Sequence, residues 1–280
     1  MTNILQYSGG KDSTAMVLWA KEHLPDFTPV FCDTGWESTY TMEYIDHINK
    51  TILDGKLVTV KSKKYDGLVE LAAKRKIVPS VRMRFCTEEL KIKPFVDWMN
   101  EQAFDEATVY QGIRSGESKA RSEMPRRVWE PLYEAWIERP LFDWTWEDVF
   151  AIHKKYGVDP NPMYTMGAKR VGCFPCIMVS KGELRRLSKH CPEIWDQIRD
   201  VENAVAEGRS FFRCDYIPER FHTGNYEKLA DKDNPDGRPV TGTFPTWADV
   251  KKYVCEADEQ QASFFEDESA RCLSVYNLCE

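Results

Sequence analysis

Long apolar runs are missing from this sequence of 280 residues. No run approaches the roughly 20 apolar residues that a helix needs to span a bilayer, so we expect no membrane association. The first residues, Met1-Thr2-Asn3, also lack the basic region and apolar core of a secretion signal. Together these absences predict a cytoplasmic protein.

Positive charge is not in excess either. The formal net charge of −7 at pH 7 argues against a generally basic nucleic-acid surface, but it leaves room for a local basic groove. Internal repeats and long low-complexity segments are absent as well. With 42 % hydrophobic and 30 % charged residues, the chain has the composition of a globular protein, and its length allows one large or two modest domains.

Cysteine, in contrast, is plentiful, with nine residues. A cytoplasmic chain is not expected to hold them in a disulfide framework. Some should therefore be metal ligands or reactive thiols, and others small core residues.

One short stretch has the composition of a phosphate-binding turn. Between a strand expected at 4–7 and a helix expected at 15–20, the chain reads Tyr7-Ser8-Gly9-Gly10-Lys11-Asp12-Ser13-Thr14. Glycines let backbone N–H groups approach phosphate closely, and a helix N-terminus adds partial positive charge. The hydroxyls add donors and the lysine adds a charge. An ordinary strand–helix turn is the alternative, but a turn alone needs neither the aspartate nor the paired hydroxyls.

Alternating strands and helices follow this turn. Residues 28–33 and 56–61 predict strands, with a helix over about 38–53 between them. This order is typical of a doubly wound parallel α/β sheet covered by helices on both faces. Ligands of such sheets bind beyond the carboxyl ends of the strands. We therefore expect Asp33-Thr34-Gly35, after the second strand, to open onto the same crevice as the first turn, although an aspartate there is also a common turn former.

Local signals predict further elements. Thr145, followed three residues later by Asp148, predicts a helix that runs to about Tyr156 and stops at Gly157. The remaining expectations are largely helical structure over 62–105, a core strand over 107–113, a hairpin within 126–140, helices over 181–187, over 193–206 and from 246, and a loop over 225–243.

Two arginines follow the strand expected at 107–113. They belong to the stretch Gly112-Ile113-Arg114-Ser115-Gly116-Glu117-Ser118-Lys119-Ala120-Arg121. Guanidinium forks match phosphate oxygens, so Arg114 and Arg121 are candidate phosphate ligands. A surface cluster of salt bridges is the alternative interpretation.

Basic residues concentrate in two stretches, Lys74–Lys93 and Lys119–Arg127. Such stretches suit DNA or RNA, and they suit a small phosphorylated ligand equally well. A solvated face with no ligand is the third possibility.

Four cysteines form the second distinctive pattern. Cys173 and Cys176 are spaced so that both thiolates reach one metal centre, Cys191 follows them, and Cys86 lies far upstream. The pattern alone fits zinc and an iron–sulfur cluster equally well, and a Cys-x-x-Cys pair can also be redox-active. Cys191, beside Pro192, is also compatible with a simple buried thiol.

The first turn resembles the PP-loop, Ser-Gly-Gly-x-Asp-Ser, of the ATP pyrophosphatase superfamily, whereas the Gly-x-x-x-x-Gly-Lys spacing of the Walker P-loop is absent. Three more stretches resemble the phosphoadenosine phosphosulfate (PAPS) reductase-like members of that superfamily. They are Asp33-Thr34-Gly35-Trp36-Glu37, Cys86–Pro94 (Cys-x-x-x-Leu-Lys-x-x-Pro) and Gly112–Arg121 (Gly-x-Arg-x-x-Glu-Ser-x-x-Arg).

The resemblance covers about residues 3–192. It implies an adenine nucleotide α-hydrolase-like α/β fold with a doubly wound parallel sheet. We expect a PP-loop nucleotide-binding domain over 1–160. A smaller, mainly helical, cysteine-bearing region with a tail should occupy 161–280.

The resemblance also implies an activity. An intact PP-loop favours cleavage of ATP between its α and β phosphates, which would activate an acceptor as an adenylate for sulfur transfer. Lys11, Asp12, Arg114 and Arg121 would carry the catalysis, with Asp12 orienting Mg²⁺ and the arginines stabilising developing charge. The expected nucleotide ligands are Ser8, Gly9, Gly10, Ser13, Thr14, Asp33, Thr34 and Gly35.

The cysteine pattern is similar to that of PAPS reductase-like proteins that act in DNA phosphorothioation and carry a 4Fe–4S cluster. It implies a cluster on Cys86, Cys173, Cys176 and Cys191, with Zn²⁺ as the alternative. The implied partners are a nucleotide, a sulfur donor such as a cysteine desulfurase, and an acceptor that is DNA, RNA or a small phosphorylated molecule. A homodimer is compatible with the pattern.

The chain departs from sulfonucleotide reductases at two places. Adenosine phosphosulfate (APS) reductases carry a Cys-Cys pair where this chain has only Cys86, and the Glu-Cys-Gly-Leu-His-like tail of PAPS reductases is missing around Cys279. Because of these differences, a PAPS or APS reductase is the first alternative and not the preferred interpretation. A non-catalytic module that binds nucleotide and cluster is the second.

Overall fold

The computed structural model describes residues 2–102, 104–205, 209–228 and 240–256. Their contacts divide the chain into two compact units. Within the described ranges, the first unit comprises residues 2–67 and 86–174, and the second comprises 68–85 and 175–256. The contacts thus place residues 68–85 with the C-terminal part, an arrangement that differs from the single expected boundary at residue 160. Cys279 and its neighbours lie outside the described residues.

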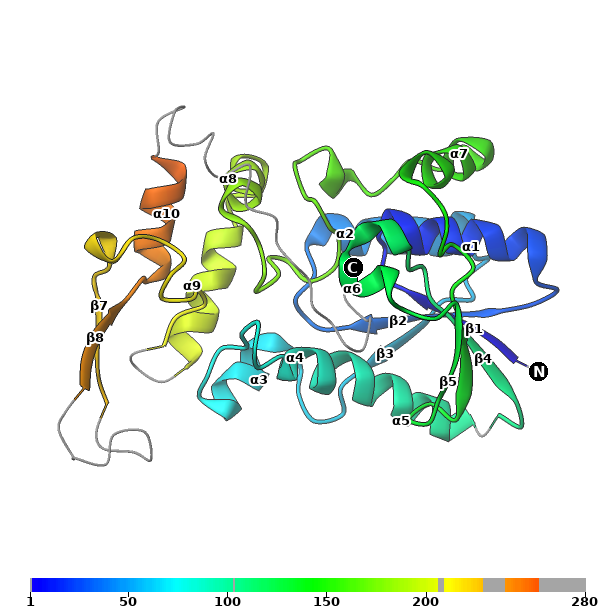
Figure 1. The fold of residues 1–280 in the computed structure, drawn as a ribbon, viewed down its shortest axis with the longest axis horizontal. Helices are drawn as coiled ribbons and strands as arrows, with labels where there is room; N and C mark the ends of the chain where they lie inside the picture. Colours follow the sequence, from blue (N-terminus) through cyan, green and yellow to red (C-terminus); the bar gives the residue numbers. More distant parts are fainter. Residues whose placement is uncertain (1, 103, 206–208, 229–239, 257–280) are drawn as a thin grey trace. The chain divides into compact units, whose positions relative to one another are not determined.

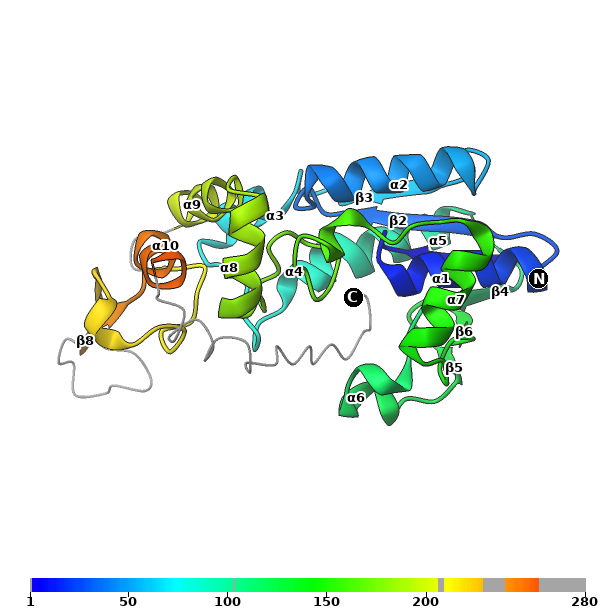
Figure 2. The same cartoon turned by 90° about the horizontal axis from the view of Figure 1, so that it is seen from above.

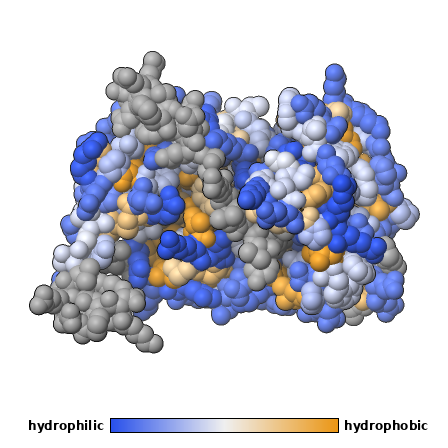
Figure 3. Space-filling view, viewed as in Figure 1, coloured by the Kyte–Doolittle hydropathy of each residue, from blue (hydrophilic) through white to orange (hydrophobic). Residues whose placement is uncertain are grey.

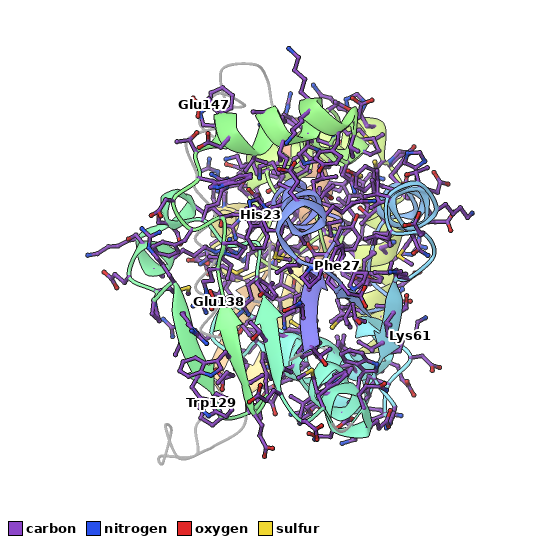
Figure 4. The ribbon with its side chains drawn as sticks, turned by 90° about the vertical axis from the view of Figure 1, so that its right-hand side faces the viewer. His23, Phe27, Lys61, Trp129, Glu138 and Glu147 are labelled. Atoms are coloured by element: carbon purple, nitrogen blue, oxygen red, sulfur yellow. The ribbon has the colours of Figure 1, made fainter. Side chains whose placement is uncertain are left out.

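A six-stranded sheet with the strand order β3-β2-β1-β4-β6-β5 forms the centre of the first unit (Figure 1). All neighbouring strands are parallel except β5, which is antiparallel to β6. The strands are β1 Thr2–Tyr7, β2 Thr28–Asp33, β3 Val58–Lys61, β4 Ala107–Tyr110, β5 Arg127–Glu130 and β6 Ala135–Glu138. Seen along the sheet, Lys61 marks the β3 edge and Trp129 the β5 edge (Figure 4). The expected α/β doubly wound class is confirmed.

Helices cover both faces of this sheet, as α1 and α5 show on opposite sides in Figure 1. Side chains alternate between faces along a strand, so neighbouring β1 residues enter different cores. Leu5 packs with α1 (Lys11–His23), α2 (Thr39–Thr51) and α7 (Trp146–Tyr156). Ile4 packs with α5 (Lys93–Gln102) on the other face.

Short elements connect the larger ones. They are α4 (Phe85–Thr87), a π-helix over Glu88–Ile92, α6 (Lys119–Ser122) and 3₁₀ turns over Ser115–Glu117 and Pro162–Tyr164. Strand β4 ends at Tyr110, earlier than the expected residue 113, because after Gln111 the chain leaves the sheet for the site described below.

Several caps follow the sequence signals. Thr145 accepts a hydrogen bond from the backbone N–H of Asp148 in a reciprocal capping box, and α7 ends at Gly157 with φ 63°. Ser38 caps α2 by accepting a hydrogen bond from the backbone N–H of Thr41. The helical expectation for 62–105 is wrong between residues 76 and 84, because Lys76 adopts φ 56° and ends the preceding helix.

The second unit is mainly helical, and Figure 2 shows its helices from above. It contains α3 (Leu68–Arg75), α8 (Lys181–His190), α9 (Ile194–Ala204) and α10 (Trp247–Cys255), with a 3₁₀ turn over Glu219–Phe221. Its fully buried side chains include Leu71, Leu184 and Ile198. A two-stranded hairpin of β7 (Gly224–Lys228) and β8 (Val240–Phe244) corrects the expectation of a continuous loop over 225–243.

Among the described residues, no helix combines the length and the apolar character that crossing a membrane requires. The face of the molecule drawn in Figure 3 is largely hydrophilic, with scattered apolar patches.

Candidate nucleotide-binding site

The turn between β1 and α1 is organised by its own hydroxyls. The Ser8 backbone N–H donates to Ser13 Oγ (3.3 Å), and Ser13 Oγ donates to the Gly10 carbonyl oxygen (3.0 Å). Gly9 adopts φ 77°, which L side chains rarely reach, and a Cβ there would lie 2.8 Å from Ile45 Cγ1. Gly10 is the N-cap of α1 and supplies no side-chain acceptor for the first N–H groups of the helix.

A buried ion-pair network joins this turn to the segment after β4. Lys11 Nζ donates to one oxygen of Asp12 (2.7 Å) and Arg114 Nε donates to the other (2.5 Å). Asp12 is only 1 % exposed. Burial alone would raise the pKa of Asp12, but the charges and hydrogen bonds of Lys11 and Arg114 outweigh it and hold that pKa below its ordinary value of 3.8. The carboxylate therefore stays ionised and fixes both cations beside the turn.

Close backbone packing brings the two segments together. A Cβ at Gly112 would lie 2.9 Å from the Asp12 carbonyl oxygen and 3.1 Å from Ser13 Cα. Only glycine permits this approach without a backbone shift. Gly112 thus lets the segment that carries Arg114 lie directly against the first turn of α1.

Arg121 has a different setting from Arg114. It is buried and forms an ion pair with Glu117, four residues earlier in the same segment. Glu117 also accepts from the Arg114 backbone N–H (2.9 Å), and Ser118 caps α6 by accepting from the Arg121 N–H (3.2 Å). Within the stretch Arg114–Arg121, Glu117 therefore contacts both arginines, and Arg114 also contacts Asp12 in the turn.

The end of β2 forms another wall of the first unit's site. Thr34 donates to Glu37 through its backbone N–H (3.1 Å) and its hydroxyl (2.6 Å), and Gly35 N–H donates to Asp33 (2.8 Å). Burial raises the pKa of Glu37. Gly35 has φ 61° and packs against the Asp66 carbonyl. Asp33 is also paired with Lys61 (2.7 Å).

A pocket opens between these walls at the carboxyl ends of β1, β2 and β4, where an open α/β sheet is expected to bind ligands. Burial raises the pKa of the Cys32 thiol to about 12, which keeps it protonated at neutral pH. The pocket is lined by Gln6, Tyr7, Ser8, Ser13, Val30, Phe31, Cys32, Glu37, Lys91, Gln111, Gly112, Ile113 and Gly172. Ser8 and Ser13 thus line one pocket with Cys32 and Glu37, which flank Asp33-Thr34-Gly35, whereas the three residues of that stretch are not among its lining.

Three contributors to the turn were not assigned a role from sequence. Asn161 Nδ2 donates to the Gly9 carbonyl oxygen (3.1 Å), and the His153 Nε2 lies 2.8 Å from the Lys11 carbonyl oxygen. The Tyr164 hydroxyl accepts from the Lys11 backbone N–H (3.1 Å). The Asn161-Pro162-Met163-Tyr164 stretch precedes the cysteine motif, but nothing in the sequence links it to a turn some 150 residues earlier.

The four candidate metal ligands are distributed over both units. Cys86 and Cys173 belong to the first, Cys176 and Cys191 to the second. Cys173 Sγ lies 3.9 Å from the Thr34 hydroxyl, next to a β-bridge between Cys173 and Glu37. Burial raises the pKa of the Cys191 thiol to about 11, so ionisation as a metal ligand would be costly there.

No group of three or more His, Cys, Asp or Glu side chains within the described ranges is placed to hold a metal ion. The cysteines at 32, 86, 173, 176, 191, 214 and 255 form no disulfide. The expected cluster ligands stay a prediction, and no chemical step is derived through a cluster.

The family model for the phosphoadenosine phosphosulfate reductase domain matches residues 2–179 of the chain. The chain belongs to this family. Together with the fold, this confirms the resemblance to PAPS reductase-like proteins of the PP-loop superfamily, whose named members include enzymes.

Some of the similar proteins are uncharacterized, and others are adenosine 5'-phosphosulfate reductases. Over 99 % of its length, the chain is 32 % identical to an uncharacterized 37.8 kDa protein of Escherichia phage 186, of which the match covers 96 %. It is 28 % identical to the adenosine 5'-phosphosulfate reductase of Streptomyces coelicolor, over 61 % of this chain and 70 % of that enzyme. A Methanocaldococcus jannaschii relative is 26 % identical over 73 % of this chain, which spans only 42 % of that protein.

Among solved structures, the PAPS reductase of Candida auris in its phosphate complex is similar with a TM-score of 0.50 and 19 % identity. The match covers 63 % of this chain and 83 % of that one. At this identity the likeness shows the shared fold.

Proposed function

We propose that the first unit binds an adenine nucleotide through its phosphates at the Ser8–Thr14 turn and cleaves ATP between the α and β phosphates. An acceptor would be activated as its adenylate and then receive sulfur. The observation that carries this proposal is the buried Lys11–Asp12–Arg114 network. It sets two cations beside the N-terminus of α1, whose N-cap residue Gly10 has no side chain, and this arrangement favours phosphate binding.

The intact Ser-Gly-Gly-Lys-Asp-Ser sequence supports ATP as the substrate. Its two serine hydroxyls lie 3.1 Å apart, and because Ser13 Oγ donates to the Gly10 carbonyl, the Ser8 hydroxyl is the one that can donate to a phosphate oxygen. Arg114 is 8 % exposed and its guanidinium is oriented by Asp12, so little conformational freedom is lost when it meets an anion. A solved relative with the same fold is described as a phosphate complex, which is compatible with an anion site in this fold.

The proposed chemistry assigns one role to each group. An acceptor oxygen attacks the α-phosphorus, the bond to the bridging oxygen breaks, and pyrophosphate leaves. Lys11 and Arg114 would stabilise the negative charge that develops on the phosphates, and Asp12 would hold both in position. Mg²⁺, when bound to the nucleotide, supplies further charge neutralisation. A sulfur nucleophile at the sulfide level, delivered by a donor protein, would then displace AMP.

Product analysis tests this function directly. Purified protein is incubated with ATP, Mg²⁺, sulfide and candidate acceptors, namely single-stranded and duplex DNA, RNA and small phosphorylated metabolites. We expect AMP and pyrophosphate in equal amounts, because cleavage at the α-phosphorus releases both. Release of ADP and phosphate, or no nucleotide cleavage with any acceptor, would contradict the proposal.

A sulfonucleotide reductase is the second candidate. It is favoured by the 28 % identity to an APS reductase over 61 % of this chain. Such an enzyme would release sulfite from APS or PAPS in the presence of a thiol reductant. Sulfite release without any ATP cleavage would establish this alternative.

A cysteine-bound cluster is proposed in addition, on Cys86, Cys173, Cys176 and Cys191. Four thiolates in one chain are the donor set of a 4Fe–4S cluster or of structural zinc. We expect protein purified without oxygen to show broad visible absorbance and about four iron atoms per chain, and Cys176→Ser to lose both. Stoichiometric zinc in a colourless protein would contradict the cluster and support the zinc alternative. Cys214→Ser is the matched control, because Cys214 is exposed and outside the set.

The acceptor is proposed to carry phosphate, because basic residues are concentrated in the stretches Lys74–Lys93 and Lys119–Arg127. Several of them are already paired with acids, as Lys93 is with Glu89 (2.8 Å) and Arg126 with Asp143. This local neutralisation favours a small phosphorylated acceptor over an extended nucleic acid.

A further inference from the structure

The hydroxyl of Tyr164 lies where an anion would be expected. It accepts a hydrogen bond from the Lys11 backbone N–H at 3.1 Å. Lys11 is the first residue of α1, whose first N–H groups have no partner within the helix. Gly10, at the N-cap, has no side chain that could accept from them. A tyrosine from a segment more than 150 residues away therefore caps the helix that begins the turn.

The side chain of Lys11 is held by the same residue. Its Nζ lies 5.1 Å from the centroid of the Tyr164 ring and 2.7 Å from Asp12 Oδ2. Cation–π contacts of this kind are worth little beside a phosphate, which offers a full negative charge. Both groups of Lys11 that suit a phosphate, the backbone N–H and the ammonium, are thus engaged by Tyr164.

The backbone that carries Tyr164 is anchored through its neighbours. Asn161 is fully buried, donates to the Gly9 carbonyl (3.1 Å) and accepts from the Met163 N–H (2.9 Å). Met163 Sδ accepts from the Ser38 hydroxyl (3.3 Å). Tyr164 is only half-buried, at the end of this anchored 3₁₀ turn. The backbone can therefore stay in place while the phenol moves.

We propose that Tyr164 is an exchangeable cap of the phosphate site. In the protein without substrate, its hydroxyl accepts the hydrogen bond of the Lys11 N–H. A phosphate oxygen of the substrate displaces the hydroxyl, and Lys11 Nζ then turns to the same phosphate. The inference rests on the proposed function only in placing the substrate's phosphate at this turn. The cap means that anion binding must break an existing internal hydrogen bond. Tyr164 therefore lowers the affinity for the anion, and it satisfies the Lys11 N–H when no anion is bound.

Isothermal titration of the full chain with inorganic pyrophosphate tests the cap. Tyr164→Phe removes the hydroxyl and keeps the ring, so we expect pyrophosphate to bind about 3- to 10-fold more tightly, the range set by one ordinary hydrogen bond. Tyr164→Leu, which lacks the ring as well, should bind at least as tightly as Tyr164→Phe. Tyr156→Phe is the control, since Tyr156 forms its hydrogen bond with Glu22, and its affinity should equal that of the natural protein. Unchanged binding by Tyr164→Phe would overturn the proposal, and weaker binding would overturn it and make the hydroxyl a ligand of the anion.

Hydrogen exchange of the free protein gives a readout that does not depend on nucleotide chemistry. The peptide that contains Lys11 should exchange faster in Tyr164→Phe than in the natural protein, and equal exchange would contradict the cap. If the natural protein binds pyrophosphate but cleaves no ATP, and Tyr164→Phe still binds more tightly, the proposed function fails and the cap stands.

Discussion

Replacing Arg114 by glutamine is expected to lower ATP turnover by about 100- to 1,000-fold, the usual loss when one preorganised charge at a transition state is removed. The substitution leaves Asp12, only 1 % exposed, with Lys11 as its remaining cation in the network. Lys11 is then held more tightly by Asp12 and is less available to phosphate. Because the change breaks a buried ion pair, we also expect a loss of up to about 3–5 kcal/mol in the free energy of unfolding.

Two comparisons separate the loss of charge from a loss of folding. The double variant Asp12→Asn with Arg114→Gln removes the uncompensated carboxylate, so it should be more stable than Arg114→Gln alone while it stays inactive. Arg126→Gln should change neither quantity appreciably, since Arg126 is 66 % exposed in its pair with Asp143. Full activity of Arg114→Gln at a saturating ATP concentration would contradict the role of the network.

The same network predicts how the free energy of unfolding changes at acidic pH. The pKa of Asp12 is lower in the folded protein than its ordinary value of 3.8, so its ion pairs stabilise the fold fully above that pH. The contribution is lost as the pH falls through the lower, folded pKa. The free energies of unfolding of the natural protein and Asp12→Asn should therefore differ most at neutral pH. They should approach each other as the pH falls below 3.8 and through the folded pKa.

Gly112→Ala is expected to weaken ATP binding at least about 10-fold and to destabilise the protein by about 1–3 kcal/mol, as overpacking usually does. The added Cβ would meet the Asp12 carbonyl oxygen at 2.9 Å and Asp12 C at 3.0 Å, and backbone atoms at this distance must shift. The shift separates Arg114 from the turn. The measurement is ATP titration together with denaturant unfolding of the purified variant.

Gly116→Ala is the matched control for this experiment. It lies four residues further along the same segment, and a Cβ there would meet nothing within 4 Å. Its unfolding free energy should stay within about 0.5 kcal/mol of the natural protein, and its affinity for ATP should be unchanged. Equal effects of the two substitutions would show that the close approach at Gly112 does not position the site.

The sequence revealed those parts of the site that lie close together along the chain. The Ser8–Thr14 turn combines a strand, two glycines and a helix start within a few residues, so its geometry could be expected from local rules. The same holds for the capping box at Thr145 and for Gly157 as the end of α7. Each of these features depends on neighbours a few positions away.

Long-range partners could not be deduced in this way. Arg114 was expected to bind phosphate, and the structure shows that its contact in the protein is Asp12, 102 residues earlier. That contact exists because β4 lies beside β1 in the sheet, on the opposite side from β2 and β3, and composition does not reveal this order. Asn161, His153 and Tyr164 could not be linked to the turn from sequence for the same reason. Their side chains bind backbone groups of the turn, and backbone groups leave no signature in the sequence.

The measurement that tests the central claim most directly is exchange of radiolabelled pyrophosphate into ATP. Reversible adenylation at the Ser8–Thr14 turn predicts exchange that requires Mg²⁺ and an acceptor, and that falls by at least about 100-fold in Arg114→Gln but not in Arg126→Gln. Absence of exchange with every acceptor, together with sulfite release from APS or PAPS, would contradict it and would make the protein a sulfonucleotide reductase.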